Sequence, residues 1–157
     1  LRRTVALKVM LPKAAANPTA KRRFTREAQA QAAVEHDHVI PIFHIGEDRG
    51  VPFLAMPMLK GETLSAALKR TPKPPVPDVL RIGREMAEGL AAAHEKGLVH
   101  RDIKPANVWL EGAKRRVKIL DFGLARAEAA AQSGDDPTIT RQGVMVGTPA
   151  YMSPEQA

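Results

Sequence analysis

Residues 100–107 of the chain read HRDIKPAN, and residues 121–123 read DFG. Together the two segments supply a candidate proton acceptor, a cation that can meet a phosphate, and two oxygen ligands suited to magnesium. The apolar run 117–120 predicts a short strand that leads into Asp121. This combination of groups indicates phosphoryl transfer.

The chain resembles the eukaryotic-like (Hanks-type) serine/threonine protein kinases of bacteria. The resemblance covers nearly every residue, because its motifs follow one another in kinase order. These motifs are Lys8, Glu27, the loop 100–107, Asp121 and residues 147–155, which read GTPAYMSPE. Each motif is weak or moderate on its own, whereas the eight-residue loop is strong. The order and spacing together favour a partial catalytic domain.

The resemblance implies an α+β fold of the protein-kinase type that is present only in part. Residues 1–56 are then the remnant of a small sheet-rich lobe, residues 57–61 the hinge, and residues 62–157 the start of the helical lobe with its catalytic and activation loops. The periodicity agrees with this division, because the expected strands come first and the helices later.

The expected elements follow from apolar spacing and from helix start and stop signals. Strands are expected over 5–10, 39–45, 51–56 and 117–120, with a turn at 46–50. Helices are expected over 20–35, over 63–70 with Thr63 as N-cap, and over 78–96 with Gly97 as the left-handed cap. Their expected buried residues are Phe24, Ala28, Ala32, Val79, Ile82, Met86, Leu90 and Ala93. A mobile loop is expected over 125–143.

The resemblance implies ATP and Mg²⁺ as cofactors. Lys8 would hold the α- and β-phosphates, and Glu27 would aim its flexible ammonium. Asn107 and Asp121 would be the magnesium ligands, since that ion prefers oxygen donors. Ala6 would form part of the roof over the adenine. Taken singly, each residue has an ordinary alternative: a solvated surface charge, a turn after a strand, a loop hydrogen bond or a core alanine.

The segment 57–61 would be the hinge whose backbone binds adenine. The implied contacts are Met58 and Leu59, and Met56 would guard the back of the pocket. Pro57 stands where members of the family usually have a carboxylate, so the hinge contact is expected to differ in detail.

Asp102 corresponds to the family's catalytic aspartate, which accepts the proton of the substrate hydroxyl. An ordinary aspartate has a pKa of about 3.9 and is ionised at neutral pH, so it needs no special tuning for this role. Lys104 would lie beside the transferring phosphate, and its presence points to serine/threonine specificity. His100 is expected to be a packed core residue that supports Phe122.

Regulation is implied by the same resemblance. Arg101, directly before the catalytic aspartate, could clamp a phosphate on the activation loop. Thr140 is at the position most often phosphorylated in bacterial relatives, and Thr138 is a second candidate, while Gln142 stands where many relatives have threonine. Thr148 is expected to order the substrate-binding loop. Ordinary loop chemistry is the alternative for the threonines.

The composition narrows the classes of function. The 157 residues include 24 Lys and Arg against 17 Asp and Glu, a net charge of +7, and no cysteine. No aromatic residues are interleaved with the basic clusters 21–23 and 114–116, so solvated surface is favoured over nucleic-acid binding. No apolar run reaches the roughly 18 residues of a membrane span. We expect a cytoplasmic protein; any membrane anchor would lie in segments of the full-length parent outside this stretch.

The implied partners are protein substrates with Ser or Thr hydroxyls and a second kinase, as dimer mate or activator. No G-x-G-x-x-G motif occurs among these residues, and the later helices of the family are absent from them. The stretch is therefore expected to be marginally stable and weakly active or inactive alone. Two alternatives stay open: a non-catalytic remnant that binds nucleotide or protein, and a basic nucleic-acid binder that rests on net charge alone.

Overall fold

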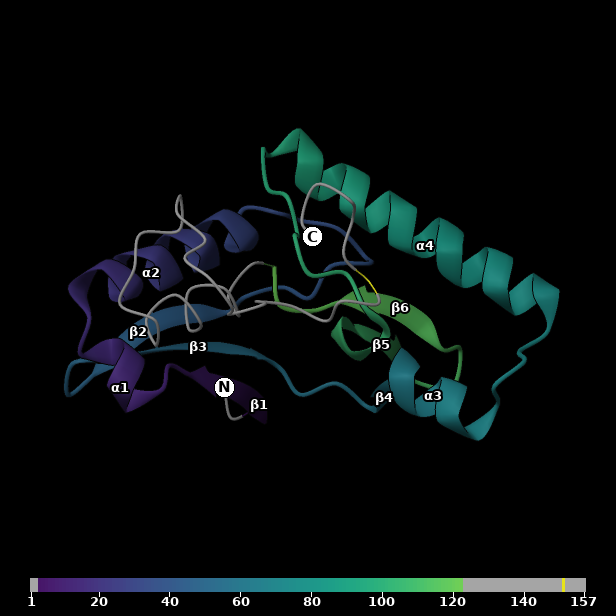
Figure 1. The fold of residues 1–157 in the computed structure, drawn as a ribbon, viewed down its shortest axis with the longest axis horizontal. Helices are drawn as coiled ribbons and strands as arrows, with labels where there is room; N and C mark the ends of the chain where they lie inside the picture. The colour runs from purple at the N-terminus through teal and green to yellow at the C-terminus, as the bar shows by residue number, and fades with distance from the viewer. Residues whose placement is uncertain (1–2, 123–150, 152–157) are drawn as a thin grey trace, which may run out of the picture.

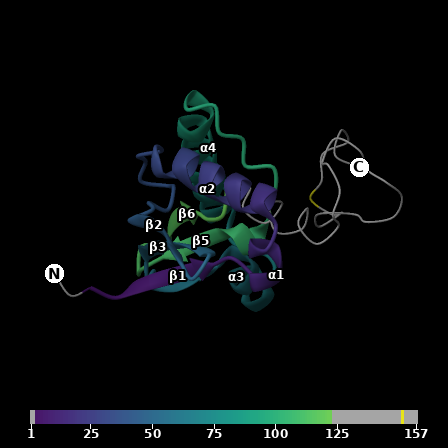
Figure 2. The same ribbon diagram turned by 90° about the vertical axis from the view of Figure 1, so that its left-hand side faces the viewer.

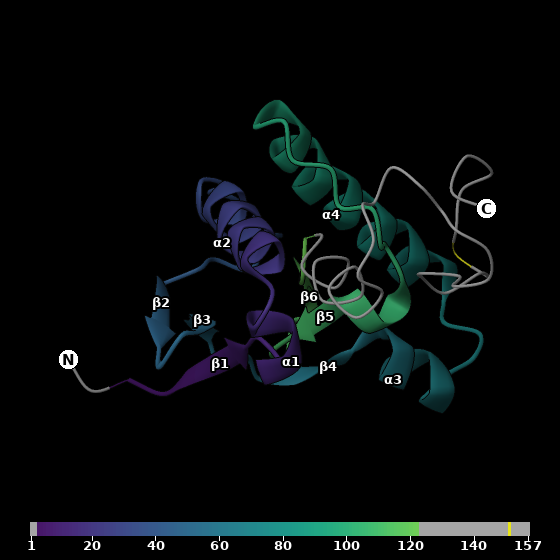
Figure 3. The same ribbon diagram turned by 60° about the vertical axis from the view of Figure 1, so that its left-hand side comes forward.

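The structure is a computed structural model that describes residues 3–122 and residue 151. Two three-stranded sheets follow one another along the molecule (Figure 1). Helix α2 covers the first sheet and helix α4 covers the second, and in Figures 2 and 3 both helices stay on the same side of the sheets. Within the described residues, no helix combines the length and apolar character needed to cross a membrane.

The first sheet carries the N-terminal part of the site. Its strands are β1 (Val5–Val9), β2 (His44–Asp48) and β3 (Val51–Pro57), in the antiparallel order β1-β3-β2. Helices α1 (Pro12–Ala15) and α2 (Pro18–Ala32) connect β1 to β2. The Asn17 side chain caps α2 by accepting from two amides at 2.9 and 3.3 Å. Phe24 and Ala28 of α2 are fully buried and pack against Leu54 of β3.

The second sheet carries the later part of the site. Its strands are β4 (Gly61–Thr63), β5 (Val108–Glu111) and β6 (Arg116–Ile119), in the antiparallel order β4-β5-β6. Helix α3 (Leu64–Arg70) and helix α4 (Val76–Glu95) precede a short 3-10 turn, η1 (Pro105–Asn107). One apolar core joins α4 to β5 and β6 and includes Ile82, Ala93, Val108, Leu110, Val117, Ile119 and Phe122.

Residues 38–40 connect the two halves of the chain. The Ile119 amide donates to the His38 carbonyl at 2.8 Å, and the Ile40 amide donates to the Ile119 carbonyl at 3.0 Å. Val39 forms a parallel bridge with Ile119. The segment between α2 and β2 therefore lies along the free edge of β6.

This pairing explains one wrong prediction. A strand was expected over 39–45, but β2 begins at His44, because residues 38–40 pair with β6 instead. The turn expected at 46–50 is likewise shorter, since β2 continues to Asp48. Apolar composition alone does not say which partner a strand-like run will find.

Two residues expected in the core are exposed. Ala32 lies at the solvent-facing end of α2, where Gln31 is buried instead and donates to the Ile40 carbonyl at 3.3 Å. Val79 is 50% exposed, whereas the other expected α4 residues are buried or partly buried. Short elements α1, β4 and β5 were not expected, because their apolar patterns are too brief to stand out.

The helix ends agree with the sequence signals. The Thr63 hydroxyl accepts from the Ala66 amide at 3.1 Å at the start of α3. Gly97 has φ +71° after α4, and the amides of Gly97 and Leu98 close that helix end. Both caps are therefore confirmed.

We predict that Gly61→Ala strongly destabilises the protein. Gly61 has φ +125°, and a Cβ there would collide with the Leu110 backbone carbonyl of the neighbouring strand. Strain plus a rigid clash should cost about 2 kcal/mol or more in a urea unfolding experiment on the full-length protein. The control is Gly83→Ala on the exposed side of α4, where a Cβ has open space and should be neutral or stabilise by up to about 1 kcal/mol. Equal effects of the two changes would contradict this account.

Candidate active site

Lys8 of β1 and Asp121, two residues after β6, meet at the centre of the site. The Lys8 Nζ and Asp121 Oδ1 atoms are 2.8 Å apart, and the two side chains are 22% and 34% exposed. The fold therefore brings these two residues into direct contact. Asp121 has φ +56°, a left-handed conformation that is uncommon for residues other than glycine and often marks functional sites. A cation and a carboxylate from opposite ends of the described chain are thus within reach of the same ligand.

Asp102, Lys104 and Asn107 form a second cluster. The Asp102 Oδ2 atom is 2.8 Å from the Lys104 ammonium and accepts from the Asn107 amide nitrogen at 2.9 Å. The same amide nitrogen donates to the Asp102 carbonyl at 2.8 Å. Because its nitrogen is committed to Asp102, Asn107 keeps its amide oxygen for another partner. An amide oxygen is one of the ligands that magnesium prefers in proteins.

A backbone bond holds the two clusters side by side. The Leu120 amide donates to the Asn107 carbonyl at 2.9 Å, and Val108 pairs with Ile119 between β5 and β6. Asp121 directly follows Leu120, so its backbone is adjacent to that of Asn107. Carboxylate and amide oxygens at such neighbouring positions fit a hard cation, and the implied Mg²⁺ is compatible with this donor set.

His100 fixes the start of the loop 100–107. The ring is 2% exposed, its Nε2–H donates to the Leu120 carbonyl at 2.8 Å, and its Nδ1 accepts from the Asp102 amide at 3.3 Å. Burial lowers the pKa of His100 below its ordinary value, against the opposing effects of the Leu120 carbonyl and two nearby carboxylates. The imidazole is therefore neutral. Its ring lies 4.7 Å from that of the buried Phe122, which confirms the expected packing role.

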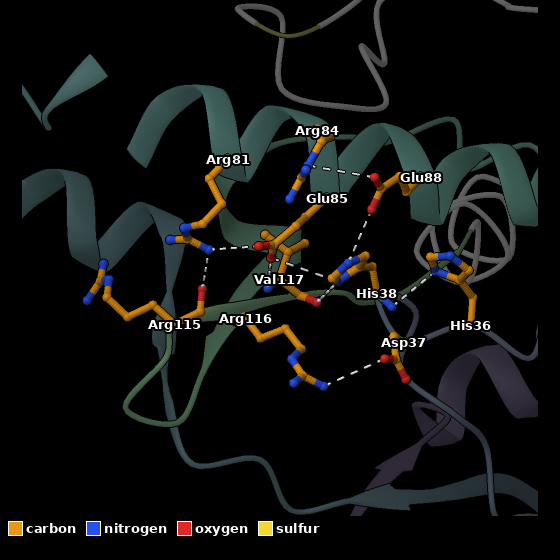
Figure 4. A network of polar contacts seen from close by, with 10 residues as sticks. All are labelled: His36, Asp37, His38, Arg81, Arg84, Glu85, Glu88, Arg115, Arg116 and Val117. Atoms are coloured by element: carbon orange, nitrogen blue, oxygen red, sulfur yellow. Dashed lines mark hydrogen bonds and ion pairs between the residues drawn. The ribbon is translucent and has the colours of Figure 1, made fainter. Parts of the chain in front are cut away.

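A buried carboxylate of α4 contacts the backbone of β6 (Figure 4). Glu85 is 8% exposed; its Oε2 accepts from the Val117 amide at 2.8 Å, and its Oε1 accepts from Arg81 at 3.0 Å. Burial alone would raise the pKa of Glu85, but the Val117 amide, Arg81 and His38 together hold it below its ordinary value. An ionised carboxylate thus supplies a hydrogen-bond acceptor to the strand that leads to Asp121.

His38 extends the same network to the segment after α2. Its Nδ1 lies 3.1 Å from the Val117 carbonyl, and its Nε2 lies 3.5 Å from Glu88 of α4. Sequence reasoning missed both His38 and Glu85. Glu85 did carry a signal, because it lies three residues after Ile82 and four before Gly89, on the buried face of the helix.

The remaining predicted site residues lie on the expected elements. Ala6 is directly opposite Met56 in the β1–β3 pairing, so both side chains lie on the same face of the first sheet. Glu27 lies on α2 and is partly buried, and its expected role beside Lys8 stays a prediction. Met58 is 63% exposed and Leu59 is partly buried in the segment between β3 and β4.

The regulatory predictions fall partly outside the described residues. Arg101 is exposed and has φ +64°, which is uncommon for arginine. Thr138, Thr140, Gln142 and Thr148 lie outside the described residues, as does the loop expected over 125–143.

The sequence of residues 2–157 matches the family described as "Protein kinase domain". The chain belongs to this family. The serine/threonine-protein kinase PknL of Mycobacterium tuberculosis is 44% identical over 157 residues, which cover 99% of this chain and 37% of that protein. The serine/threonine-protein kinase pkn2 of Myxococcus xanthus is 42% identical over 160 residues, which cover all of this chain and 19% of that protein.

Solved structures agree with the family. The crystal structure of the PknI kinase domain of Mycobacterium tuberculosis has a TM-score of 0.68 and 35% identity, and the match covers 84% of this chain and 56% of that one. The expected α+β kinase fold is therefore confirmed. This kinase-domain chain spans a little over half of the solved domain and 37% or less of the two curated relatives named above.

We predict that Glu85→Ala lowers the free energy of unfolding by about 2–3 kcal/mol, because the change leaves the buried Val117 amide and Arg81 without their acceptor. Urea unfolding of the full-length protein measures this effect. The matched control is Glu95→Ala, an exposed residue of the same helix, which should change stability by less than about 0.5 kcal/mol. Similar losses in both variants would mean that the buried contacts of Glu85 do not decide the result.

We also predict that acid weakens this kinase domain through His100. Its pKa is lower in the folded state than the unfolded value of about 6.5, so the unfolded chain binds more protons below that pH. The stabilisation is complete above pH of about 6.5 and is lost as the pH falls towards the folded pKa. Denaturation between about pH 5 and pH 8 should show this slope in the wild type and a weaker one in His100→Gln.

The control for this titration is His94→Gln, which makes the same change of side chain at an exposed histidine of α4. If His100→Gln kept the full wild-type slope, the buried imidazole would not be its source.

Proposed function

We propose that this chain is the catalytic core of a serine/threonine protein kinase that transfers the γ-phosphate of ATP to protein hydroxyls. The carrying observation is the 2.8 Å contact of Lys8 with Asp121, next to the cluster of Asp102, Lys104 and Asn107. Membership of the protein kinase family and relatives named as serine/threonine-protein kinases support the reaction class.

Asp102 is the proposed proton acceptor. Its Oδ2 already binds Lys104 and Asn107, which orients the carboxylate and leaves Oδ1 for the substrate hydroxyl. As the hydroxyl oxygen attacks the γ-phosphorus, its proton passes to Asp102 and the bond to the β-phosphate oxygen breaks, releasing ADP. The Lys104 ammonium then neutralises charge on the transferring group.

The nucleotide is proposed to bind between Lys8 of the first sheet and the residues Asn107 and Asp121 beside the second sheet. Lys8 would exchange its contact with Asp121 for the α- and β-phosphates, with Glu27 aiming the ammonium. Asn107 and Asp121 would hold Mg²⁺, which when bound neutralises charge on the phosphate oxygens. The partly buried ion pair of Lys8 and Asp121 holds both side chains near these positions before the nucleotide binds.

The adenine end is proposed to lie against the segment between the two sheets. β3 ends at Pro57 and β4 begins at Gly61, so residues 57–61 fit a hinge between a small lobe over 1–56 and a larger one from residue 62. Within this scheme Met58 and Leu59 contact adenine, while Ala6 and Met56, opposite one another in register, line the roof and the back of the pocket.

Regulation and partners complete the proposal. Arg101 would bind a phosphate on Thr140 or Thr138, Thr148 would order the substrate loop, and a second kinase would act as activator or dimer mate. The 157 residues alone are proposed to have little activity. Support comes from three apolar α4 side chains, Val76, Val79 and Leu80, which are 69%, 50% and 68% exposed and so offer surface for further packing.

The test is phosphate transfer by the full-length protein to a serine-containing peptide. Asp102→Asn should lower kcat by about a hundredfold or more, because the hydroxyl loses its proton acceptor while the shape of the site is kept. Asp48→Asn, at an exposed residue of β2, is the matched control and should change kcat little.

Unchanged kcat in Asp102→Asn would refute the assigned role. ATP binding by the wild type without any transfer would favour the alternative function, a remnant that binds nucleotide and has lost the chemistry.

A further inference from the structure

A cavity outside the catalytic cluster lies at the turn between β5 and β6. Its volume is about 490 Å³. Its walls are Met58 and Lys60 from the segment after β3, and residues 111–114 with Arg116 from the β5–β6 hairpin. Met58 and Lys60 belong to the proposed hinge 57–61, whereas the other lining residues come from the β5–β6 hairpin, which has no role in the proposed nucleotide site.

Backbone bonds fix one wall of this cavity to the other. The Lys60 carbonyl accepts from the Gly112 amide at 2.9 Å and from the Trp109 indole at 3.3 Å. Gly112 and Arg115 have φ +63° and +52°, which close the hairpin tightly. The cavity is therefore part of the rigid frame of the second sheet and does not depend on side-chain positions alone.

The cavity carries uncompensated positive charge. Lys60, Lys114 and Arg116 line it against a single carboxylate, Glu111. Within the described part of the chain, Lys60 and Lys114 form no ion pair, and Arg116 only approaches the 81%-exposed Asp37 at 3.7 Å. Three cations held on one rigid frame repel one another unless a counter-charge is bound.

Glu62 of β4 does not neutralise these lysines, because it binds two arginines outside the cavity. Glu62 binds Arg70 through two contacts of 2.6 and 2.8 Å and binds Arg115 at 2.9 Å. Its carboxylate is thus saturated by two arginines outside the cavity. The described residues supply no further acid to Lys60 and Lys114, so both ammonium groups are exposed and available to an anionic ligand.

We propose that this cavity docks an acidic segment of a protein partner. Carboxylates of that segment would meet Lys60 and Lys114, and an adjacent apolar side chain would pack against Met58 and Ala113. A peptide fits better than a nucleic acid, because none of the described residues that line the cavity is aromatic and could stack on a base, and because Glu111 repels closely spaced phosphates. Glu111 can instead accept from a peptide N–H. Docking of this kind does not require phosphate transfer.

The experiment measures binding of a labelled twelve-residue peptide of repeating Glu-Leu-Asp to the full-length protein by fluorescence anisotropy. Binding should be saturable at about 0.15 M salt, where a screened surface charge alone attracts weakly. Lys60→Glu with Lys114→Glu should weaken it at least about tenfold. Replacing Leu by Ser in the peptide should also weaken binding, since the apolar contact is lost.

A matched variant, Lys13→Glu with Lys73→Glu, makes the same change of net charge at exposed lysines outside the cavity and should alter affinity less than about threefold. The single change Lys114→Glu, in the hairpin turn, serves if the double variant does not fold.

Three outcomes would overturn the proposal: no saturable binding, equal losses in the two charge variants, or an affinity indifferent to the Leu-to-Ser replacement. A twelve-base-pair DNA duplex that bound more tightly than the peptide, and lost that binding in the Lys60 and Lys114 variants, would reassign the surface to nucleic acid.

Discussion

The backbone of Ile119 holds the two halves of this domain together. On one edge β6 pairs with β5, and on the other Ile119 exchanges hydrogen bonds with residues 38–40, the segment that leaves α2. These backbone groups are buried with Ile119 itself, so breaking the pairing would leave unsatisfied polar groups in the core. Asp121 comes two residues later. Its position relative to Lys8 therefore depends on a joint made of main-chain bonds, which side-chain changes alter little.

Polar side chains reinforce this joint where the apolar core ends. Glu85 supplies an ionised acceptor to β6, and His38, next to Glu85, contacts the Val117 carbonyl of the same strand. A buried charge of this kind is stabilising only if every partner is present, since desolvation opposes it. Desolvation also disfavours the charged form of the buried His100. The neutral ring accepts from the Asp102 amide and donates to the Leu120 carbonyl. Neutral hydrogen bonds thus tie the loop 100–107 to Leu120, and the ionised Glu85 ties β6 to α4.

Local signals in the sequence predicted local structure well. Thr63 caps the start of α3 and Gly97 follows the end of α4 as expected, because a cap depends on one side chain or one φ angle. Predictions failed where a long-range partner decides. Residues 39–45 were expected to form one strand, yet residues 38–40 pair with β6 and β2 begins only at His44. Val79 is 50% exposed, although Ile82 on the same apolar stripe is buried. Glu85 was overlooked because its hydrogen-bond partner, the Val117 amide, lies on a strand that is distant in the sequence.

By itself, the sequence determined which reactive groups the chain carries, in which order, and on which kinds of element. Only the tertiary structure decided that the Lys8 ammonium lies 2.8 Å from Asp121 and that one oxygen of Asp102 serves both Lys104 and Asn107. The physical reason is that spacing and propensity act over a few residues. Distances between remote side chains are set by sheet register and by the packing of a shared core.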